Sequence, residues 1–502
     1  MTAPIPTTPH RTVRFQLDDT ADWRRDPSID IESDRSWVEQ EDFMFSDDEF
    51  DEGDLGVSGG EGGRSRAPLL TDRDAPAVRM SMDLEGTNAE GVLEGGRPKS
   101  GLGMAFFNMS NSIIGAGIIG QPYAFKQAGL GMGAFLLVTL TVVVNWTINL
   151  IVINSKLSGA NSFQSTVSAC FGRPGLIAIS VAQWAFAFGG MIAFCIIIGD
   201  SIPHVMAAMF PRIEDTPVLS LLTNRRAVIV LTTVGISYPL SLYRDIAKLA
   251  KASAFALLSM LVIILTVLTQ GPLVKAEDKG KMSTPLWTIN GGIFQAIGVI
   301  SFAFVCHHNS LLIYGSLRKP TLDRFATVTN YSTGISLIAC LAMALGGFLT
   351  FKDKTEGNVL NNFPPNNVMV NIARLCFGLN MLTTLPLEAF VCREVMETYY
   401  YPTSPFSAHR HIIFTTALVF AAMFLSLITC DLGAVFELIG ATSACALAYI
   451  LPPLCYIKMA KRSWKTVPAM VTVGFGAIVM VISLVQAVVK IVVGGGEQKL
   501  CN

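Results

Sequence analysis

Long apolar runs separated by short polar connections fill this chain from residue 103 almost to its end. A run of about 18 or more apolar residues is long enough to cross the ~30 Å hydrocarbon core of a bilayer as an α-helix. We therefore expect an all-α integral membrane protein. The pattern predicts eleven transmembrane helices, at residues 103–125, 131–153, 174–203, 226–242, 252–270, 289–315, 327–350, 367–392, 411–429, 432–457 and 467–490.

The first hundred residues lack this pattern. Residues 1–100 hold 23 Asp and Glu against 11 Lys and Arg, and they are rich in Gly, Pro and Ser. Such a segment cannot bury enough apolar surface to offset the entropy of ordering, so its composition predicts a disordered acidic tail. Lys and Arg favour the loops on the same side as this tail, which predicts a cytosolic N-terminus. We expect sorting or signalling partners to bind the tail, a transmembrane domain at residues 101–490 and a short C-terminal tail at 491–502.

The overall composition narrows the class of protein. Hydrophobic residues make up 51% of the chain and charged residues 15%, with a net charge of −1, which is not the composition of a soluble domain. The sequence has no HExxH, no CxxC and no GxxxxGK[ST] motif, so neither a metal site nor direct use of ATP is indicated. We expect no enzyme activity, no cofactor, no metal and no nucleic-acid partner.

The first apolar run contains the stretch "NMSNSIIGAGIIGQPYAF" at residues 108–125, which is unlike a simple membrane anchor. Gly115 lies ~18 Å into the span at 1.5 Å per residue, close to the bilayer midplane. Two glycines around Ala116 favour local unwinding, and non-helical backbone at that depth persists only where it lines a cavity. We predict an interrupted helix that binds substrate, with Asn111 and Ser112 beside it. Close helix packing through small residues is the alternative.

Polar residues in the sixth span follow the stretch "SFAF", which has no proline or glycine, so the residues alone do not predict a break there. His307 and His308 come next. Adjacent histidines point in different directions on a helix and make a poor metal pair without a third ligand. Their predicted roles are hydrogen bonds between helices or a proton-linked gate.

The eighth span places Thr383 and Thr384 just before Pro386, which frees a backbone carbonyl one turn back. Hydroxyl and carbonyl oxygens are suitable ligands for Na⁺, although a threonine that bonds to its own helix gives the same pattern. Glu388 is a candidate proton carrier or a partner of Arg393.

Two acidic residues lie near the ends of other spans, on the side opposite the tail. The hydropathy pattern predicts that Asp200 and Glu437 are interfacial rather than buried.

Three stretches, "SNSIIGAGIIGQPYAFKQAGLGMG", "SFAFVCHHNSLLIYGSL" and "LPLEAFVCREV", resemble the first, sixth and eighth helices of the amino acid/auxin permease family. This family belongs to the larger group of amino acid–polyamine–organocation transporters, and the likeness points to its vacuolar and lysosomal neutral amino acid transporters. It covers residues 101 to about 490. The resemblance implies two inverted five-helix repeats, with helices 1 and 6 interrupted, plus one extra C-terminal helix.

The resemblance also implies roles for particular residues. Main-chain groups of helix 1 would bind the amino acid backbone, helix 6 would supply side-chain walls, and an asparagine of helix 1 with a threonine of helix 8 would hold a coupling ion. The implied substrate residues are Ile114, Gly115, Ala116, Gly117, Phe302 and Phe304, and the implied ion residues are Asn111 and Thr384.

Together these features predict a secondary active transporter of neutral amino acids that works by alternating access. The gradient of H⁺ or Na⁺ supplies the energy. The predicted location is the vacuolar or lysosomal membrane, with the plasma membrane second. The alternative function is a membrane sensor that binds amino acids and signals without appreciable transport.

Overall fold

The structure is a computed structural model that describes residues 101–210, 212, 215, 219–243, 253–281, 289–461, 463–464 and 466–493. The side chains of residues 253–255 and 487–493 are outside the description. The predicted acidic tail and nearly all of the predicted C-terminal tail lie outside the described residues. Across the described part the regular elements are all helical, as expected from the hydropathy pattern.

The helical elements follow one another with short connections. The α-helices are α1 (Leu102–Ile114), α2 (Gln121–Ala128), α3 (Leu130–Ser158), α4 (Phe163–Met209), α5 (Arg225–Thr232), α6 (Tyr238–Ser241), α8 (Ser253–Gln270), α9 (Ile293–Phe304), α10 (Ser310–Ser316), α11 (Leu322–Phe351), α12 (Val368–Tyr400), α13 (Ala408–Ile428), α14 (Leu432–Ile439), α15 (Leu451–Met459) and α16 (Thr466–Val493). The 3₁₀ turns are η1 (Ala116–Gly120), η3 (Leu219–Leu222), η5 (His307–Asn309), η6 (Lys352–Lys354) and η7 (Val359–Asn362), and the π-helical turns are η4 (Thr233–Ser237), η8 (Gly440–Ala444) and η9 (Ala446–Ile450).

Nine helical segments in the described part are long and apolar enough to cross a bilayer. The other two predicted spans, 226–242 and 252–270, correspond to shorter helical pieces: α5, η4 and α6 in one and α8 in the other. The chain is therefore a multi-pass, all-helical membrane protein. The total of eleven spans and the inverted repeats stay predictions.

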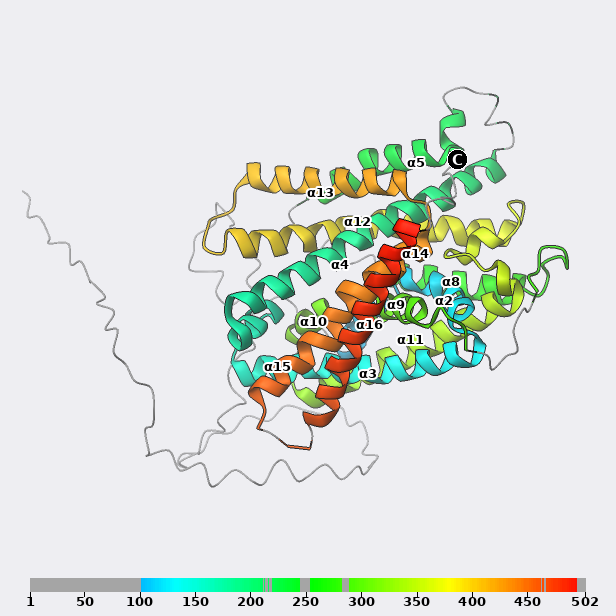
Figure 1. The fold of residues 1–502 in the computed structure, drawn as a ribbon. Coiled ribbons are helices and arrows are strands. Elements are labelled where there is room, and N and C mark those ends of the chain that lie inside the picture. The colour runs from blue at the N-terminus through cyan, green and yellow to red at the C-terminus, as the bar shows by residue number, and fades with distance from the viewer. Residues whose placement is uncertain are drawn as a thin grey trace, which may run out of the picture. The chain divides into compact units, whose positions relative to one another are not determined.

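The membrane-spanning helices differ in how far they are enclosed by the rest of the protein. Of the nine segments, Ile293–Ser316 is the most enclosed, with 78% of its most apolar part buried, whereas 22% is buried in Thr466–Gln486. α9 packs against α2, α14 and η8, and α4 packs along α12. In Figure 1 the long helices α3, α4, α11, α12 and α13 run roughly from left to right, and α16 crosses the view at a steep angle to them.

Glycine allows the closest of these contacts. A Cβ atom on Gly440 would overlap the carbonyl of Gly298, and a Cβ on Gly298 would lie 2.7 Å from the carbonyl oxygen of Glu437. These two glycines bring the backbones of α9 and the α14–η8 segment together. Glycines thus allow close helix packing at this crossing. In the first span, glycine instead allows the helix to be interrupted.

Candidate functional site

The first span is interrupted at the residue that the sequence indicates. α1 ends at Ile114, and Gly115 adopts φ 26° and ψ −150°, a conformation outside the range of ordinary L-residues. The chain continues as the 3₁₀ turn η1 and then as α2, with Pro122 in its first turn. A helix end leaves its last carbonyl groups, and the next helix its first amides, without partners inside the helix.

The sixth span is also interrupted, just after "SFAF". α9 ends at Phe304, and Val305 is extended with φ −79° and ψ 101°. Cys306 follows with φ −115° and ψ 17°, and the 3₁₀ turn η5 leads into α10. His307 and His308 are therefore part of a 3₁₀ turn beside the break, not two neighbours on a continuous helix.

The two interruptions lie against each other. A Cβ atom on Gly117 would overlap Ala303 in the last turn of α9. Asn309 Nδ2 donates to Ser112 Oγ over 3.4 Å, and the sulfur atoms of Cys306 and Met109 are 3.6 Å apart. The structure thus brings together the predicted residues of span 1 and the end of α9, which the sequence spacing alone could not place.

Some main-chain groups near the interruption already make hydrogen bonds within the protein and are therefore not free to bind a ligand. The carbonyl of Gly117 accepts a hydrogen bond from Gln121 Nε2 at 3.2 Å, and the amide of Gly115 donates to the carbonyl of Asn111 at 3.1 Å. Ile114 and Ala116 are buried, and Gly115 is partly exposed. Gln121 is fully buried, and its Oε1 has no partner among the described residues.

Phe302 belongs to an aromatic cluster on the other side of the break. Its ring stacks on Phe436 of α14 with centroids 4.5 Å apart, and Phe186 of α4 lies 5.6 Å from it. His308 lies 5.4 Å from Phe186. Phe304 is fully buried in the core. Phe302 therefore lies between aromatic side chains from two other spans.

The two histidines differ in their contacts. His307 is fully buried, and its Nε2 lies 2.9 Å from the hydroxyl of Thr147 in α3. His308 is partly buried, and its Nδ1 has no hydrogen-bond partner in the described part of the chain. The described residues contain no cluster of three His, Cys, Asp or Glu side chains with metal-binding geometry.

Both predicted threonines of span 8 bond to their own helix. The hydroxyls of Thr383 and Thr384 donate to the carbonyl of Asn380, at 2.9 Å and 2.8 Å. Thr384 also lies 3.2 Å from Asn380 Oδ1. Asn111 is partly buried and makes no side-chain hydrogen bond with the described residues. The structure thus shows no hydrogen bond between Asn111 and Thr384.

Glu388 does not pair with Arg393, so that alternative is wrong. Arg393 Nη1 donates to the carbonyl of Ser241 at 3.1 Å and to the hydroxyl of Thr415 at 2.6 Å. The Glu388 side chain lies beside Gly190 of α4, where a Cβ would be 3.7 Å from its Cγ. Its Oε2 is buried and has no hydrogen-bond partner among the described residues.

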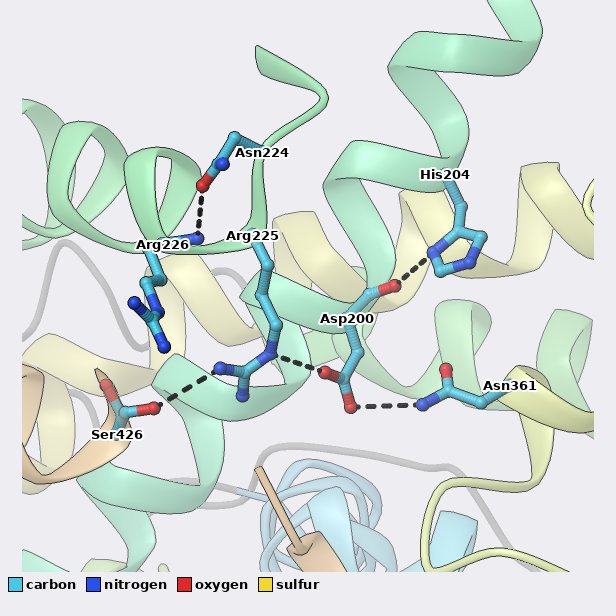
Figure 2. A network of polar contacts seen from close by, with 7 residues as sticks. All are labelled: Asp200, His204, Asn224, Arg225, Arg226, Asn361 and Ser426. Atoms are coloured by element: carbon cyan, nitrogen blue, oxygen red, sulfur yellow. Dashed lines mark hydrogen bonds and ion pairs between the residues drawn. The ribbon is translucent and has the colours of Figure 1, made fainter. Parts of the chain in front are cut away.

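Asp200 is buried, contrary to the prediction that it is interfacial. Only 8% of the residue is exposed, because an arginine and an amide from other elements satisfy its carboxylate. Arg225 Nε donates to Oδ1 at 3.1 Å, and Asn361 Nδ2 donates to Oδ2 at 3.2 Å (Figure 2). Buried charges in proteins are retained where they are paired in this way.

The same network reaches two further helices. Arg225 Nη1 lies 3.5 Å from the carbonyl oxygen of Ser426 at the end of α13. Arg374 of α12 is fully buried and donates to the carbonyls of Leu360 and Phe363, on both sides of Asn361. These contacts position Asn361 beside Asp200. An acidic residue within an apolar run was the only sequence signal for this network.

A polar cavity of about 450 Å³ lies at this end of the protein. None of the predicted substrate residues lines it; its wall comes from the end of α2, α4, the start of α5, the segment between α11 and α12, and the start of α14. The lining residues are Tyr123, Lys126, Asp200, Arg225, Lys354, Thr355, Glu356, Gly357, Asn358, Asn361, Cys430, Asp431 and Leu432. Tyr123 donates to Glu437 Oε1 at 3.0 Å, which joins α2 to α14.

Comparison with known proteins gives consistent matches. The family model "Transmembrane amino acid transporter protein" matches residues 98–494. The chain is 43% identical to vacuolar amino acid transporter 2 of Saccharomyces cerevisiae, over 84% of this chain and 90% of that protein. It is 39% identical to putative sodium-coupled neutral amino acid transporter 11 of Danio rerio, over 77% and 86%.

A solved structure with a similar fold is a crystal structure of a mutant manganese transporter from Eremococcus coleocola. The TM-score is 0.50 at 12% sequence identity, and the match covers 79% of this chain and 89% of that chain. At this identity the likeness concerns the fold alone.

Proposed function

We propose a transport mechanism for this chain, which belongs to the transmembrane amino acid transporter protein family. The family consists of transporters, so the chain is not an enzyme. The proposed function is secondary active transport of neutral amino acids by alternating access. The relative from Saccharomyces cerevisiae is named for the vacuole, which supports a vacuolar membrane location. A cytosolic N-terminus is part of the proposal and rests on the distribution of Lys and Arg in the loops. The acidic tail is the proposed contact for sorting or signalling partners.

The observation that carries this proposal is the contact between two helix interruptions inside the bundle. α1 and η1 meet at Gly115, and α9 and η5 meet at Val305 and Cys306. The carbonyl end of α1 favours an ammonium group, and the amides that begin the next segment favour a carboxylate. An amino acid carries both groups on one carbon, so it fits a site between such ends.

Side chains complete the proposed site. Asn111 and Ser112 flank the break on α1, while Ile114, Ala116 and Gly117 surround it in the chain. Phe302 is the proposed apolar wall, because it stacks on Phe436 and faces Phe186 from α4. Phe304, which is fully buried, is the other proposed side-chain wall. An apolar wall suits a neutral amino acid, since it would leave a charged side chain without a partner.

Proteoliposome uptake tests the function directly. We expect the purified full-length protein to accumulate a labelled neutral amino acid above the outside concentration when a pH or Na⁺ gradient is imposed. The uptake measurement is repeated with each of the common amino acids in turn. A sensor would bind the label only in proportion to the protein present and would not accumulate it. That stoichiometric plateau would contradict the transport proposal.

The proposed coupling ion is H⁺, carried by Glu388. An unpaired carboxylate inside a membrane protein is costly, whereas a neutral carboxylic acid is tolerated. Glu388 Oε2 is buried and has no hydrogen-bond partner in the described part of the chain, which fits a group that gains and loses a proton during the cycle. His307 and His308 lie at the interruption of span 6 and are proposed to gate the proton path, with His307 held by Thr147.

Glu388→Gln is expected to abolish uptake driven by a pH gradient, because an amide cannot carry the proton. Exchange of bound for free amino acid, measured without a gradient, is expected to stay within about twofold of the wild-type rate. The control is Glu397→Gln on the same helix, whose carboxylate lies 3.9 Å from Arg410. Unchanged pH-driven uptake in Glu388→Gln would remove Glu388 from the coupling role.

Sodium coupling through Asn111, Thr383 and Thr384 is the second candidate, because relatives of this chain are named as sodium-coupled. Both threonine hydroxyls point to Asn380, while the Asn111 amide makes no hydrogen bond in the described part of the chain. If Na⁺ is the coupling ion, Asn111→Ala and Thr384→Ala raise the Na⁺ concentration needed for half-maximal uptake, and Glu388→Gln does not. Uptake measured across a Na⁺ series separates the two candidates.

A further inference from the structure

The polar cavity near Asp200 is separate from the interruption at Gly115, although the two share elements. α2 connects them, since Tyr123 and Lys126 line the cavity and Gln121 bonds to Gly117. α14 also connects them, since Leu432 lines the cavity and Phe436 stacks on Phe302 one turn further along. Residues of the central break itself do not contribute to the cavity wall.

One part of the cavity wall presents hydrogen-bond donors without acceptors. Arg225 uses Nε for Asp200 and Nη1 for the carbonyl of Ser426, but its Nη2 is buried and makes no hydrogen bond with the described residues. Asn358 uses Oδ1 to accept from the amide of Leu360, and its buried Nδ2 is in the same situation. Unsatisfied buried donors are costly, so two of them at one cavity indicate a missing acceptor.

The Asp200 carboxylate accepts from Arg225 Nε and Asn361 Nδ2, and neither Arg225 Nη2 nor Asn358 Nδ2 reaches it in hydrogen-bonding geometry. A carboxylate from a bound molecule has the right chemistry. Arginine holds carboxylates with short, charge-assisted hydrogen bonds, and an amide NH₂ adds a second donor.

A different part of the wall suits a cation. Asp431 is exposed and lines the cavity, and one of its oxygens accepts from the amide of Ala434 at the start of α14. Lys126 Nζ donates to the carbonyl of Thr355 and Lys354 Nζ donates to the carbonyl of Glu277, so both ammonium groups have backbone acceptors. Leu432 and the ring of Tyr123 supply apolar surface.

We propose that this cavity is a second amino acid site, which holds the carboxylate of a neutral amino acid at Arg225 and Asn358 and its ammonium group at Asp431. This inference rests on the proposed function for the identity of the ligand class. A volume of about 450 Å³ is ample for one amino acid. In this proposal the cavity binds the substrate first. The substrate then passes along α2 and α14 to the interruption at Gly115.

Isosteric variants test this site. Asn358→Asp keeps the oxygen that caps Leu360 but replaces the unpartnered donor with a carboxylate that repels the ligand. Asp431→Asn keeps the cap on Ala434 and removes the charge that holds the ammonium group. The matched control is Asn224→Asp, an exposed cap of α5 that accepts from the amides of Arg226 and Ala227 and does not line the cavity (Figure 2).

The probe is tritiated L-leucine, bound to the purified full-length protein in lipid nanodiscs. We expect a binding component that Asn358→Asp and Asp431→Asn each weaken at least tenfold and that Asn224→Asp leaves within twofold. Isopentylamine and 4-methylpentanoate, which each keep one of the two charged groups, are expected to compete at least tenfold less well than leucine. Thermal unfolding of each variant shows whether it is folded at the binding temperature.

Identical leucine binding in all four proteins would overturn the proposal. Competition by 4-methylpentanoate equal to that by leucine would also overturn it, because the cavity would then bind any carboxylate. Leucine uptake on the same preparations separates the two proposals. Normal uptake with variant-independent binding contradicts the second site alone. Variant-sensitive binding, with none of the common amino acids taken up by the wild type, contradicts the proposed transport function alone.

Discussion

Replacing Gly117 with alanine is expected to eliminate transport and to lower the thermal stability of the protein. The new Cβ would overlap both the Cα and the Cβ of Ala303, and backbone cannot rotate away as a side chain does. Overpacking in a close contact costs roughly 1–3 kcal/mol. The end of α9 must move for the methyl group to fit, which separates the two interruptions that form the proposed site.

Two variants make this expectation specific. Gly103→Ala adds a methyl group to α1 where no atom lies within 4 Å, so it should retain wild-type uptake and melting temperature. The double variant Gly117→Ala with Ala303→Gly removes one of the two overlapping atoms and should recover part of the stability. Unfolding followed by tryptophan fluorescence, together with uptake, measures both effects. Wild-type values for Gly117→Ala would show that the two segments are not in tight contact.

Replacing Gly115 with alanine is the second change with a large expected effect. The reason differs, because the nearest atom to a new Cβ would be the carbonyl oxygen of Asn111 at 3.7 Å, so space is available. The backbone has φ 26° and ψ −150°, which an alanine adopts only with strain of about 1–3 kcal/mol. The strain favours a continuous helix, which closes the break. We expect at least a tenfold loss of amino acid uptake.

The comparison for this variant is Gly334→Ala in α11, where the glycine lies inside a regular helix with open space around it. Alanine is the better helix former by roughly 1 kcal/mol, so this control should be neutral or slightly stabilising. Equilibrium binding of the transported amino acid shows whether Gly115→Ala removes the site or only slows the cycle. Wild-type binding and uptake in Gly115→Ala would mean that substrate binding and transport do not depend on the helix interruption at Gly115.

The neighbouring glycines therefore have different roles that their sequence positions do not distinguish. Gly115 is needed for its backbone conformation, and Gly117 is needed because another chain segment lies against it. The stretch "GAG" predicted an interruption, and the structure has one there. The alternative interpretation, close packing, also describes part of the same stretch.

The second interruption shows where local sequence is insufficient. Val305 and Cys306 are not helix breakers, yet the chain leaves the helix at these residues. Packing of α9 against Gly117 on one side and against the α14–η8 segment on the other fixes the end of this helix. The position of His307 and His308 in a 3₁₀ turn follows from that packing.

The sequence by itself determined the membrane class, the helical content, the first interruption and the family. It could do so because a bilayer imposes one length and one polarity on every crossing, and because glycine has a conformational freedom that other residues lack. Only the tertiary structure decided which polar groups meet. Asp200, Arg225 and Asn361 come from three separate elements of the chain, and their pairing depends on how α4, α5 and η7 pack. Hydropathy reports each residue's own preference for lipid or water, whereas burial of a charge depends on the partner that another segment provides.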